Sequence, residues 1–242
     1  MKHFSLLCRL MLLCLFCLIS MSAFSQGVAI YKKNGAMVKF AYEEIDSIVT
    51  YNYGETPGVP VTPPTAPLCE AVDLGLSVKW ASFNVGATKP EEYGGYYAWG
   101  ETEEKESYFE ENYLYYNNGS YTNIGNDISG TQYDVAHVKW GGDWRMPTFA
   151  EQQELIDNCT WELTTVNGVY GYKVTGSNGN SIFLPAAGCR YESEIDDVGN
   201  AGYYFSSTMS DELSVIIYFD DGDKMLYSNY SFYGHSVRPV CE

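Results

Sequence analysis

The residues of this sequence that could carry out acid–base chemistry are few. The chain has three histidines, and only His137 and His235 follow the predicted leader at residues 1–25. Histidine is the usual base near neutral pH. Neither residue lies in a motif typical of a serine hydrolase, a zinc protease or a phosphate-binding loop. We interpret His137 as a hydrogen-bonded structural residue and His235 as a ligand contact. The sequence therefore predicts a protein that is not an enzyme, with no catalytic residue, no metal and no cofactor.

One acidic run could hold a cation. Asp220-Asp221-Gly222-Asp223 offers the hard oxygen ligands that Ca²⁺ prefers. The bidentate glutamate that completes an EF-hand loop does not follow at the required spacing. An ordinary acidic turn is the favoured interpretation of Asp220–Asp223, and calcium binding there stays an open alternative.

The late loops of the chain contain residue types that suit molecular recognition. Tyrosine gives a large contact area at low entropic cost, and Ser, Asn and Gly give adaptable hydrogen bonds. We expect four side chains to be largely exposed and to share one face with Arg190 and Tyr191; they are Tyr227, Tyr230, Tyr233 and His235. The predicted ligand contacts are Arg190, Tyr191, Tyr227, Asn229, Tyr230, Tyr233 and His235. The alternative is that these aromatic residues only pack the loops of a chain with 22 tyrosines.

Four cysteines follow the leader: Cys69, Cys159, Cys189 and Cys241. An even number in an exported chain predicts two disulfides, for which three connectivities are possible. We favour Cys69–Cys241, which would join the two ends of one domain. The second pair would then be Cys159–Cys189, linking a helix end to a strand. Buried free thiols are the alternative.

The N-terminus and the charge of the chain indicate export. Residues 1–25 combine Lys2 and Arg9 with an apolar run and small residues before Gln26, as in a secretory signal peptide. The formal net charge is −17, so the chain has no basic patch that could neutralise phosphates, and nucleic-acid binding is disfavoured. We expect an exported protein at the cell surface, in the periplasm or outside the cell, with no transmembrane span in the mature chain.

Most of the predicted elements are strands. The convincing helix covers residues 148–158, where Thr148 and Glu151 form a capping box before apolar residues at helical spacing. Period-two alternation over 72–80 predicts a half-buried strand. Further strands are expected at 94–100, 161–166, 170–175, 181–185, 203–207, 213–219, 225–227 and 235–241. Residues 101–132 are interpreted as a long, partly ordered insertion.

The chain divides into four predicted segments. The signal peptide at 1–25 is followed by a small β segment at 26–53, in which Asn34-Gly35 predicts a hairpin between Val28–Tyr31 and Met37–Phe40. Residues 54–67 form a proline-rich linker. Residues 68–242 form the main domain, which is long enough for one good core.

Five sequence blocks of the main domain resemble the Fibrobacter succinogenes major paralogous domain family of exported bacterial proteins. The blocks occur in order as Ala71–Ala81, Trp144–Thr148, Asn180–Gly188, Tyr203–Ser207 and Ser236–Val240. That family is similar to the C-type-lectin-like fold shared with formylglycine-generating enzymes. The resemblance therefore implies an α+β, C-type-lectin-like domain with antiparallel strands and one main helix. Residues 27–53 also resemble a short segment at the start of such surface proteins.

The sequence departs from both functional types that share this fold. The Glu-Pro-Asn or Gln-Pro-Asp loop and the Trp-Asn-Asp strand of calcium-dependent lectins are absent. The late cysteines, Cys189 and Cys241, do not match the active pair with which formylglycine-generating enzymes bind copper. We therefore expect a binding or adhesion module that recognises a protein or glycan. The alternatives are an assembly subunit of a surface appendage, in which 28–49 exchanges a strand, and an oxidase.

Overall fold

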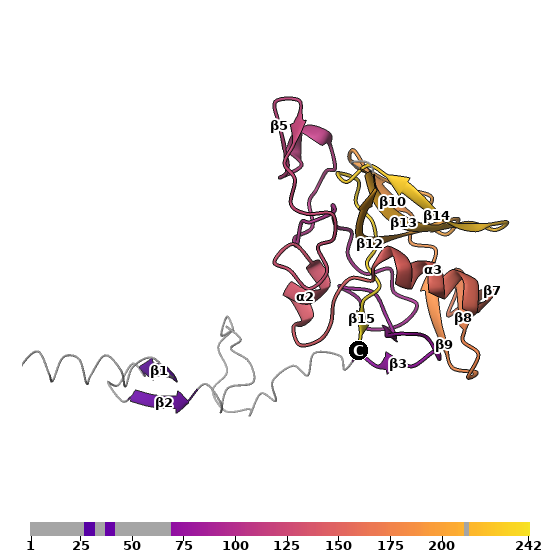
Figure 1. The fold of residues 1–242 in the computed structure, drawn as a ribbon, viewed down its shortest axis with the longest axis horizontal. Helices are drawn as coiled ribbons and strands as arrows, with labels where there is room; N and C mark the ends of the chain where they lie inside the picture. Colours follow the sequence, from indigo (N-terminus) through magenta and orange to yellow (C-terminus); the bar gives the residue numbers. More distant parts are fainter. Residues whose placement is uncertain (1–26, 32–36, 42–68, 211–212) are drawn as a thin grey trace, which may run out of the picture. The chain divides into compact units, whose positions relative to one another are not determined.

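The computed structural model describes residues 27–31, 37–41, 69–210 and 213–242. The chain divides into two units, Met1–Pro63 and Pro64–Glu242. In the first unit, β1 (Gly27–Tyr31) pairs antiparallel with β2 (Met37–Ala41), which confirms the predicted pairing (Figure 1). The predicted signal peptide (1–25), the linker (54–67) and the remainder of the small β segment lie outside the described residues.

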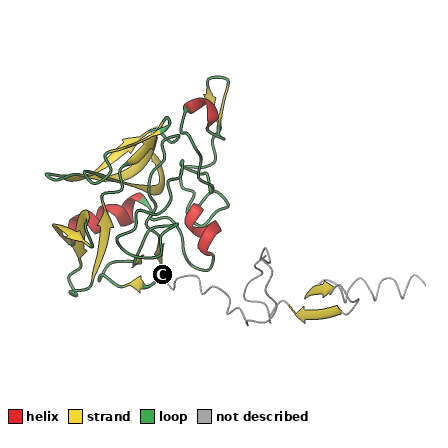
Figure 2. Cartoon of the chain, turned by 180° about the vertical axis from the view of Figure 1, so that it is seen from behind, coloured by secondary structure: helices red, strands yellow, loops and turns green. Residues whose placement is uncertain are grey.

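The second unit consists mainly of small antiparallel sheets. Strands account for 39% of the structure and helices for 11%, and the sheets are mostly separate and do not close into a barrel. The expected α+β class, with a C-type-lectin-like domain, is therefore wrong. The one predicted helix is present, but the strands around it are short and are interrupted by turns. No described sheet has more than three strands, so loops carry much of the burial (Figure 2).

The main helix, α3 (Phe149–Asn158), begins as predicted. The Thr148 hydroxyl accepts a hydrogen bond from Glu151 N (3.3 Å), and the Glu151 carboxylate accepts one from Thr148 N (2.8 Å). This reciprocal capping box satisfies two N–H groups that the first turn leaves unpaired. Arg145 donates to both Glu151 oxygens at 2.6 and 2.9 Å. The ion pair therefore holds the helix start against the preceding loop.

The helix α3 lies between two three-stranded sheets (Figure 1). One is formed by β7 (Thr160–Val166), β8 (Val169–Thr175) and β9 (Ser181–Pro185). The other is formed by β12 (Gly202–Ser210), β13 (Leu213–Phe219) and β14 (Lys224–Asn229). Leu155 of the helix, Leu184 of the first sheet and Ile217 of the second meet in one core cluster. These six strands confirm six of the seven that were predicted after the helix.

The expected strand over 72–80 is wrong, because the chain turns within it. Its ends form β3 (Ala71–Val72) and β4 (Lys79–Ala81), which lie in one sheet with β15 (Val240–Cys241). Between them, the Asp73 carboxylate accepts from Gly75 N, and Gly75 has a φ of +75°. The expected final strand, 235–241, likewise shortens to β15.

The long insertion is ordered and aromatic. It contains the short 3₁₀ helix η2 (Glu110–Asn112) and the hairpin of β5 (Tyr116–Asn117) and β6 (Ser120–Tyr121), which form one tip of the unit (Figure 1). Tyr108 and Tyr113 are buried with Phe232 of the late loops in a separate core cluster. The expectation of partial order is therefore wrong, because buried tyrosines fix the insertion to the rest of the unit.

A second helix was not predicted. In α2 (Val135–Trp140), the Asp134 carboxylate caps the N-terminus by accepting from Ala136 N and His137 N. The residues before it also depart from expectation, because 94–100 forms no strand. Tyr97 makes only an isolated bridge to His235, and buried Trp99 donates its indole N–H to Ser206 O. Side-chain packing, rather than a sheet ladder, holds this stretch.

Arg238 is the largest charged group in the core, with 1% of its surface exposed. Its guanidinium donates to Asn84 Oδ1 (2.8 Å), Ala81 O (3.1 Å) and Phe183 O (2.8 Å). Arg238 forms no salt bridge with any described residue, so these three neutral acceptors alone satisfy its charge. Burial lowers the pKa of Arg238 to about 10, which leaves it protonated at neutral pH. The residue thus joins β4, β9 and the C-terminal segment.

Candidate functional site

The structure separates the predicted ligand contacts into exposed and buried residues. Tyr191, Tyr227 and Tyr230 expose 37%, 56% and 52% of their surface. Arg190, Asn229 and Tyr233 are half-buried. His235 is fully buried. The expected exposure is therefore confirmed for Tyr227 and Tyr230, and wrong for Tyr233 and His235.

Three of these tyrosines form what we call the aromatic surface: Tyr191, Tyr230 and Tyr233. The ring centroid of Tyr233 lies 4.7 Å from that of Tyr191 and 5.7 Å from that of Tyr230. The backbones of Arg190 and Gly234 exchange two hydrogen bonds, at 2.7 and 2.8 Å, which place β10 (Cys189–Tyr191) beside the late loop. The structure thus brings together residues that lie about forty positions apart in the sequence.

A packed base supports the aromatic surface. The ring of Phe232, which is buried, stacks under Tyr230 at 5.3 Å and meets Tyr233 edge-on at 5.0 Å. A Cβ at Gly234 would lie 2.7 Å from the Tyr108 ring, so no larger residue fits there without a shift. This base limits the motion of the exposed rings, which lowers the entropic cost of binding a partner.

The aromatic surface has a neighbour that the sequence did not identify. Tyr121, at the end of β6, is 41% exposed, and its ring lies 5.1 Å from that of Tyr116. Burial, a hydrogen bond with Glu110 and the nearby Tyr230 are among the causes that raise the pKa of Tyr121. The only sequence signal was the abundance of tyrosine in the insertion, and nothing in it indicated that β6 folds toward the late loop.

Tyr227 lies apart from the aromatic surface. It stands on β14 opposite Ile216 of β13, next to exposed Met225 on the same face of the sheet. Among the described residues its ring stacks on no other aromatic ring. It is therefore an exposed tyrosine outside the cluster, which makes it a natural control.

His235 orders the late loop from within. Its ring stacks on Tyr203 at 5.4 Å and meets Phe205 at 4.6 Å. The Asn229 oxygen accepts from Tyr230 N (2.8 Å), which fixes the amide so that its NH₂ donates to His235 Nε2 (3.3 Å). The imidazole proton then lies on Nδ1, which has no hydrogen-bond partner among the described residues.

The environment of His235 excludes the predicted contact with a ligand. Burial lowers the pKa of His235 to about 3, so the ring is neutral at physiological pH. A neutral, fully enclosed imidazole cannot touch a partner. Its role is to hold Asn229, and through it the backbone of Tyr230, in place.

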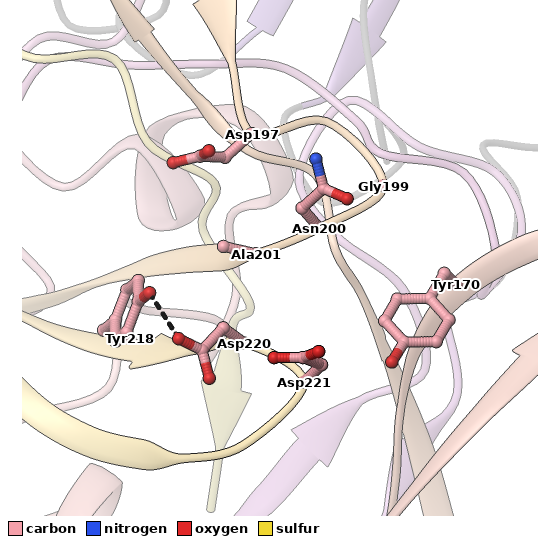
Figure 3. Close-up of a pocket in the computed structure, with 8 residues that line it drawn as sticks. All are labelled: Tyr170, Asp197, Gly199, Asn200, Ala201, Tyr218, Asp220 and Asp221. Carbon is pink, nitrogen blue, oxygen red and sulfur yellow. Dashed lines mark hydrogen bonds between the residues drawn. The ribbon is translucent and has the colours of Figure 1, made fainter.

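A polar cleft of about 490 Å³ lies elsewhere on the unit (Figure 3). Its walls come from β8, from the loop that follows β11 (Glu194–Asp196) and from the turn between β13 and β14. The residues that line it are Tyr170, Asp197, Gly199, Asn200, Ala201, Tyr218, Asp220 and Asp221. The acidic turn was the only sign of this cleft in the sequence.

The acidic run at the cleft is a structured turn. One oxygen of Asp220 accepts from Gly222 N and Asp223 N, each at 2.9 Å, and the other accepts from the Tyr218 hydroxyl at 2.8 Å. The hydrogen bond from Gly222 N is the main cause that lowers the pKa of Asp220. Within the described ranges, no group of three or more His, Cys, Asp or Glu side chains could hold a metal ion. The favoured turn interpretation accounts for these contacts.

The four cysteines are free, so the predicted disulfides Cys69–Cys241 and Cys159–Cys189 are absent from the structure. The reason is geometric for the first pair. Cys241 pairs with Lys79 on one side of β4, whereas Cys69 lies by Ser82 on the β3 side. Outer strands of a three-stranded sheet are about 9.5 Å apart, beyond the Cα separation that a disulfide spans.

The second predicted pair joins two cysteines that lie in different surroundings. Cys159 ends α3 and packs on the helix core, whereas Cys189 lies in β10 and pairs with Asp196. Burial raises the pKa of Cys189 to about 12 and also raises that of Cys241. Neither thiol is a reactive thiolate at neutral pH, which counts against a copper-binding pair.

We expect Cys189 to resist alkylation in the folded protein. Its thiol is buried and has a raised pKa, so iodoacetamide should label half-buried Cys69 first and Cys189 only after unfolding. Mass spectrometry of peptides after timed labelling would measure the order. Recovery of Cys189 in a disulfide-linked peptide would contradict this expectation.

None of the helices in the described part of the chain has the length and apolar character needed to cross a bilayer. No family model, no curated protein and no solved structure was found to match this chain.

Proposed function

We propose that this protein is a non-catalytic binding module that recognises a protein or a glycan through its aromatic surface. The observation that carries the proposal is the meeting of Tyr191 and Tyr230, both exposed, on the ring of Tyr233. Tyrosine is among the residues that most often dominate the binding energy of an interface. Rings that are already held in place lose little conformational entropy when a partner binds.

Two further features support recognition over mere loop packing. The rings of Tyr230 and Tyr233 pack on buried Phe232, yet 52% of the surface of Tyr230 stays exposed. The half-buried guanidinium of Arg190 lies over the ring of Tyr96, 5.7 Å from its centroid, and adds a cation beside the surface. Tyrosine and arginine together are enriched at the centres of interfaces.

The exported location and the resemblance to the Fibrobacter family stay predictions, since both rest on sequence alone. An exported module would meet its partner outside the cytoplasm. The aromatic surface needs no metal for binding, because ring faces and phenol hydroxyls supply both apolar and hydrogen-bonding contacts.

The proposal is tested by screening the full chain and its Tyr191→Ala/Tyr230→Ala variant in parallel on glycan and protein arrays. Both rings are at least one-third exposed, so the variant should fold with nearly unchanged thermal stability. We expect signals that the unchanged chain gives and the variant loses. If every signal survives in the variant, the aromatic surface is not the binding site.

A further inference from the structure

The described turns contain three Asn-Gly pairs, and such pairs are chemically labile. They are Asn118-Gly119, Asn167-Gly168 and Asn178-Gly179. Asparagine is a thermolabile residue, and glycine has no side chain that could shield its backbone nitrogen. All three pairs are exposed, and an added Cβ at any of the three glycines would meet nothing within 4 Å. Residue type and exposure therefore do not distinguish the three pairs. A fourth pair, Asn34-Gly35, lies outside the described residues.

Two of the pairs form almost the same turn. The φ values of Asn118 and Gly119 are +49° and +82°, and those of Asn167 and Gly168 are +50° and +85°. Positive φ at both central residues is typical of the type I′ turn that joins two antiparallel strands. The first turn joins β5 to β6, and the second joins β7 to β8. The two asparagines therefore have the same backbone φ, and only their surroundings differ.

The side chains of the three asparagines differ in what restrains them. The amide of Asn167 donates to Glu91 Oε1 at 2.8 Å, and this hydrogen bond is the main cause that lowers the pKa of Glu91. The amide of Asn178 donates to Asp73 O at 2.9 Å. The side chain of Asn118 makes no hydrogen bond with any described residue. Asn118 is thus the one of the three whose amide can turn without first breaking a bond.

The strands beside the turns also differ in length. The hairpin that carries Asn118 pairs only Tyr116 with Tyr121 and Asn117 with Ser120, at one tip of the unit (Figure 1). The pairing of β7 with β8 extends over seven residues of each strand. A short hairpin opens locally at a lower cost than a long one. The backbone around Asn118 therefore resists a change of conformation least.

We propose that Asn118 is a site of spontaneous deamidation, and that it converts faster than Asn167 and Asn178 because nothing restrains its amide. The backbone nitrogen of Gly119 attacks Cγ of Asn118, the new N–C bond closes a succinimide ring, and the bond from Cγ to Nδ2 breaks. Ammonia leaves with the proton of the Gly119 nitrogen. Water then opens the ring at either carbonyl and gives aspartate or isoaspartate, with no oxidation or reduction.

The product changes the tip of the β5–β6 hairpin. Both forms add a negative charge, and isoaspartate also lengthens the main chain of the turn by a methylene group. The register of a hairpin depends on the length of its turn. Tyr121 follows this turn and packs on Tyr116 at 5.1 Å, so deamidation would disturb the neighbour of the aromatic surface. The deamidation itself does not depend on the proposed binding function.

The test is a timed incubation of the full chain at neutral pH, followed by tandem mass spectrometry of proteolytic peptides to locate each converted asparagine. We expect Asn118 to convert about fivefold or more faster than Asn167, whose bond to Glu91 must first break. Asn178 should also convert more slowly than Asn118. In concentrated urea the three rates should converge, because the fold that separates them is lost.

Glu91→Ala is the matched variant, since it removes the acceptor of Asn167 and leaves the hairpin of Asn118 unchanged. Asn167 should convert severalfold faster in this variant, and Asn118 at its former rate. Thermal unfolding establishes that the variant is folded during the incubation. Three results would overturn the proposal. They are equal rates at Asn118 and Asn167 in the folded chain, faster conversion at Asn178 than at Asn118, and an unchanged rate at Asn167 in folded Glu91→Ala.

Discussion

Lowering the pH from 7.5 to 5 should reduce the free energy of unfolding by about 2 kcal/mol through His235 alone. The pKa of this residue is lowered to about 3 in the folded protein by burial, against 6.5 as its ordinary value. The folded state therefore binds fewer protons than the unfolded state. The stability from His235 is full above pH 6.5 and is lost progressively as the pH falls toward 3.

The groups packed around His235 do not titrate in this range. Tyr203 and Tyr233 face the ring, and burial raises the pKa of each. Asp197, which accepts from the Tyr203 hydroxyl, is exposed. Protonation of His235 would therefore place an imidazolium among aromatic rings without a carboxylate in contact, which is unfavourable.

The matched control for this prediction is His235→Gln. A glutamine oxygen can accept from Asn229 in place of Nε2, but it does not titrate. Urea unfolding at several pH values would measure both proteins, and the difference between their curves isolates His235 from all other groups. Parallel curves for the two proteins between pH 7.5 and 5 would show that His235 is not a buried neutral residue.

Replacing Arg238 with lysine should lower the free energy of unfolding by about 3 kcal/mol. The variant keeps a buried positive charge, but one ammonium cannot reach the three acceptors on Asn84, Ala81 and Phe183. An acceptor that stays buried without its donor costs about 1–3 kcal/mol. The loss of planar, multidentate geometry thus outweighs the conserved charge.

Arg190→Lys is the control for this substitution. The half-buried guanidinium of Arg190 makes one long hydrogen bond, to Glu106 O at 3.4 Å, so its variant should lose less than about 0.5 kcal/mol. The double variant Arg238→Lys/Asn84→Ala should be less destabilised than the sum of the two single variants, because they share a bond. The free energies of unfolding are measured by chemical denaturation. A value for Arg238→Lys within 0.5 kcal/mol of that of the unchanged chain would contradict the hydrogen-bond network around Arg238.

The features that were predictable from the sequence depend on residues close together in the chain. The capping box of Thr148 and Glu151 spans one helical turn, so its local signal was sufficient. The strands β7–β9 and β12–β14 each run for five or more residues, and the turns after β7, β8 and β13 contain Asn-Gly or Asp-Gly pairs. Local pattern and fold agree there.

The features that were missed depend on contacts between distant segments. Leu74 continues an alternating pattern but sits in a turn, because the side chains of Asn178 and Asn180 donate to Asp73 O from another hairpin. His235 lies in a polar loop but is enclosed by Tyr203 and Phe205 of β12. Composition indicated a binding loop, but only the folded chain shows which of its residues face solvent.

The expected class failed for a related reason. One helix with antiparallel strands is compatible with several arrangements, and the blocks that resemble a known family did not determine how the sheets associate. The structure has separate small sheets, with α3 between two of them and an aromatic insertion packed on the late loop.

The most direct test of the aromatic surface is the affinity of Tyr230→Ala and Tyr227→Ala for a partner found by array screening. Both tyrosines are more than half exposed, yet only Tyr230 contacts Tyr233. We expect the dissociation constant to rise about tenfold or more in Tyr230→Ala, as at an interface hot spot, and less than twofold in Tyr227→Ala. Equal losses in the two variants, or a loss confined to Tyr227→Ala, would contradict the placement of the binding site.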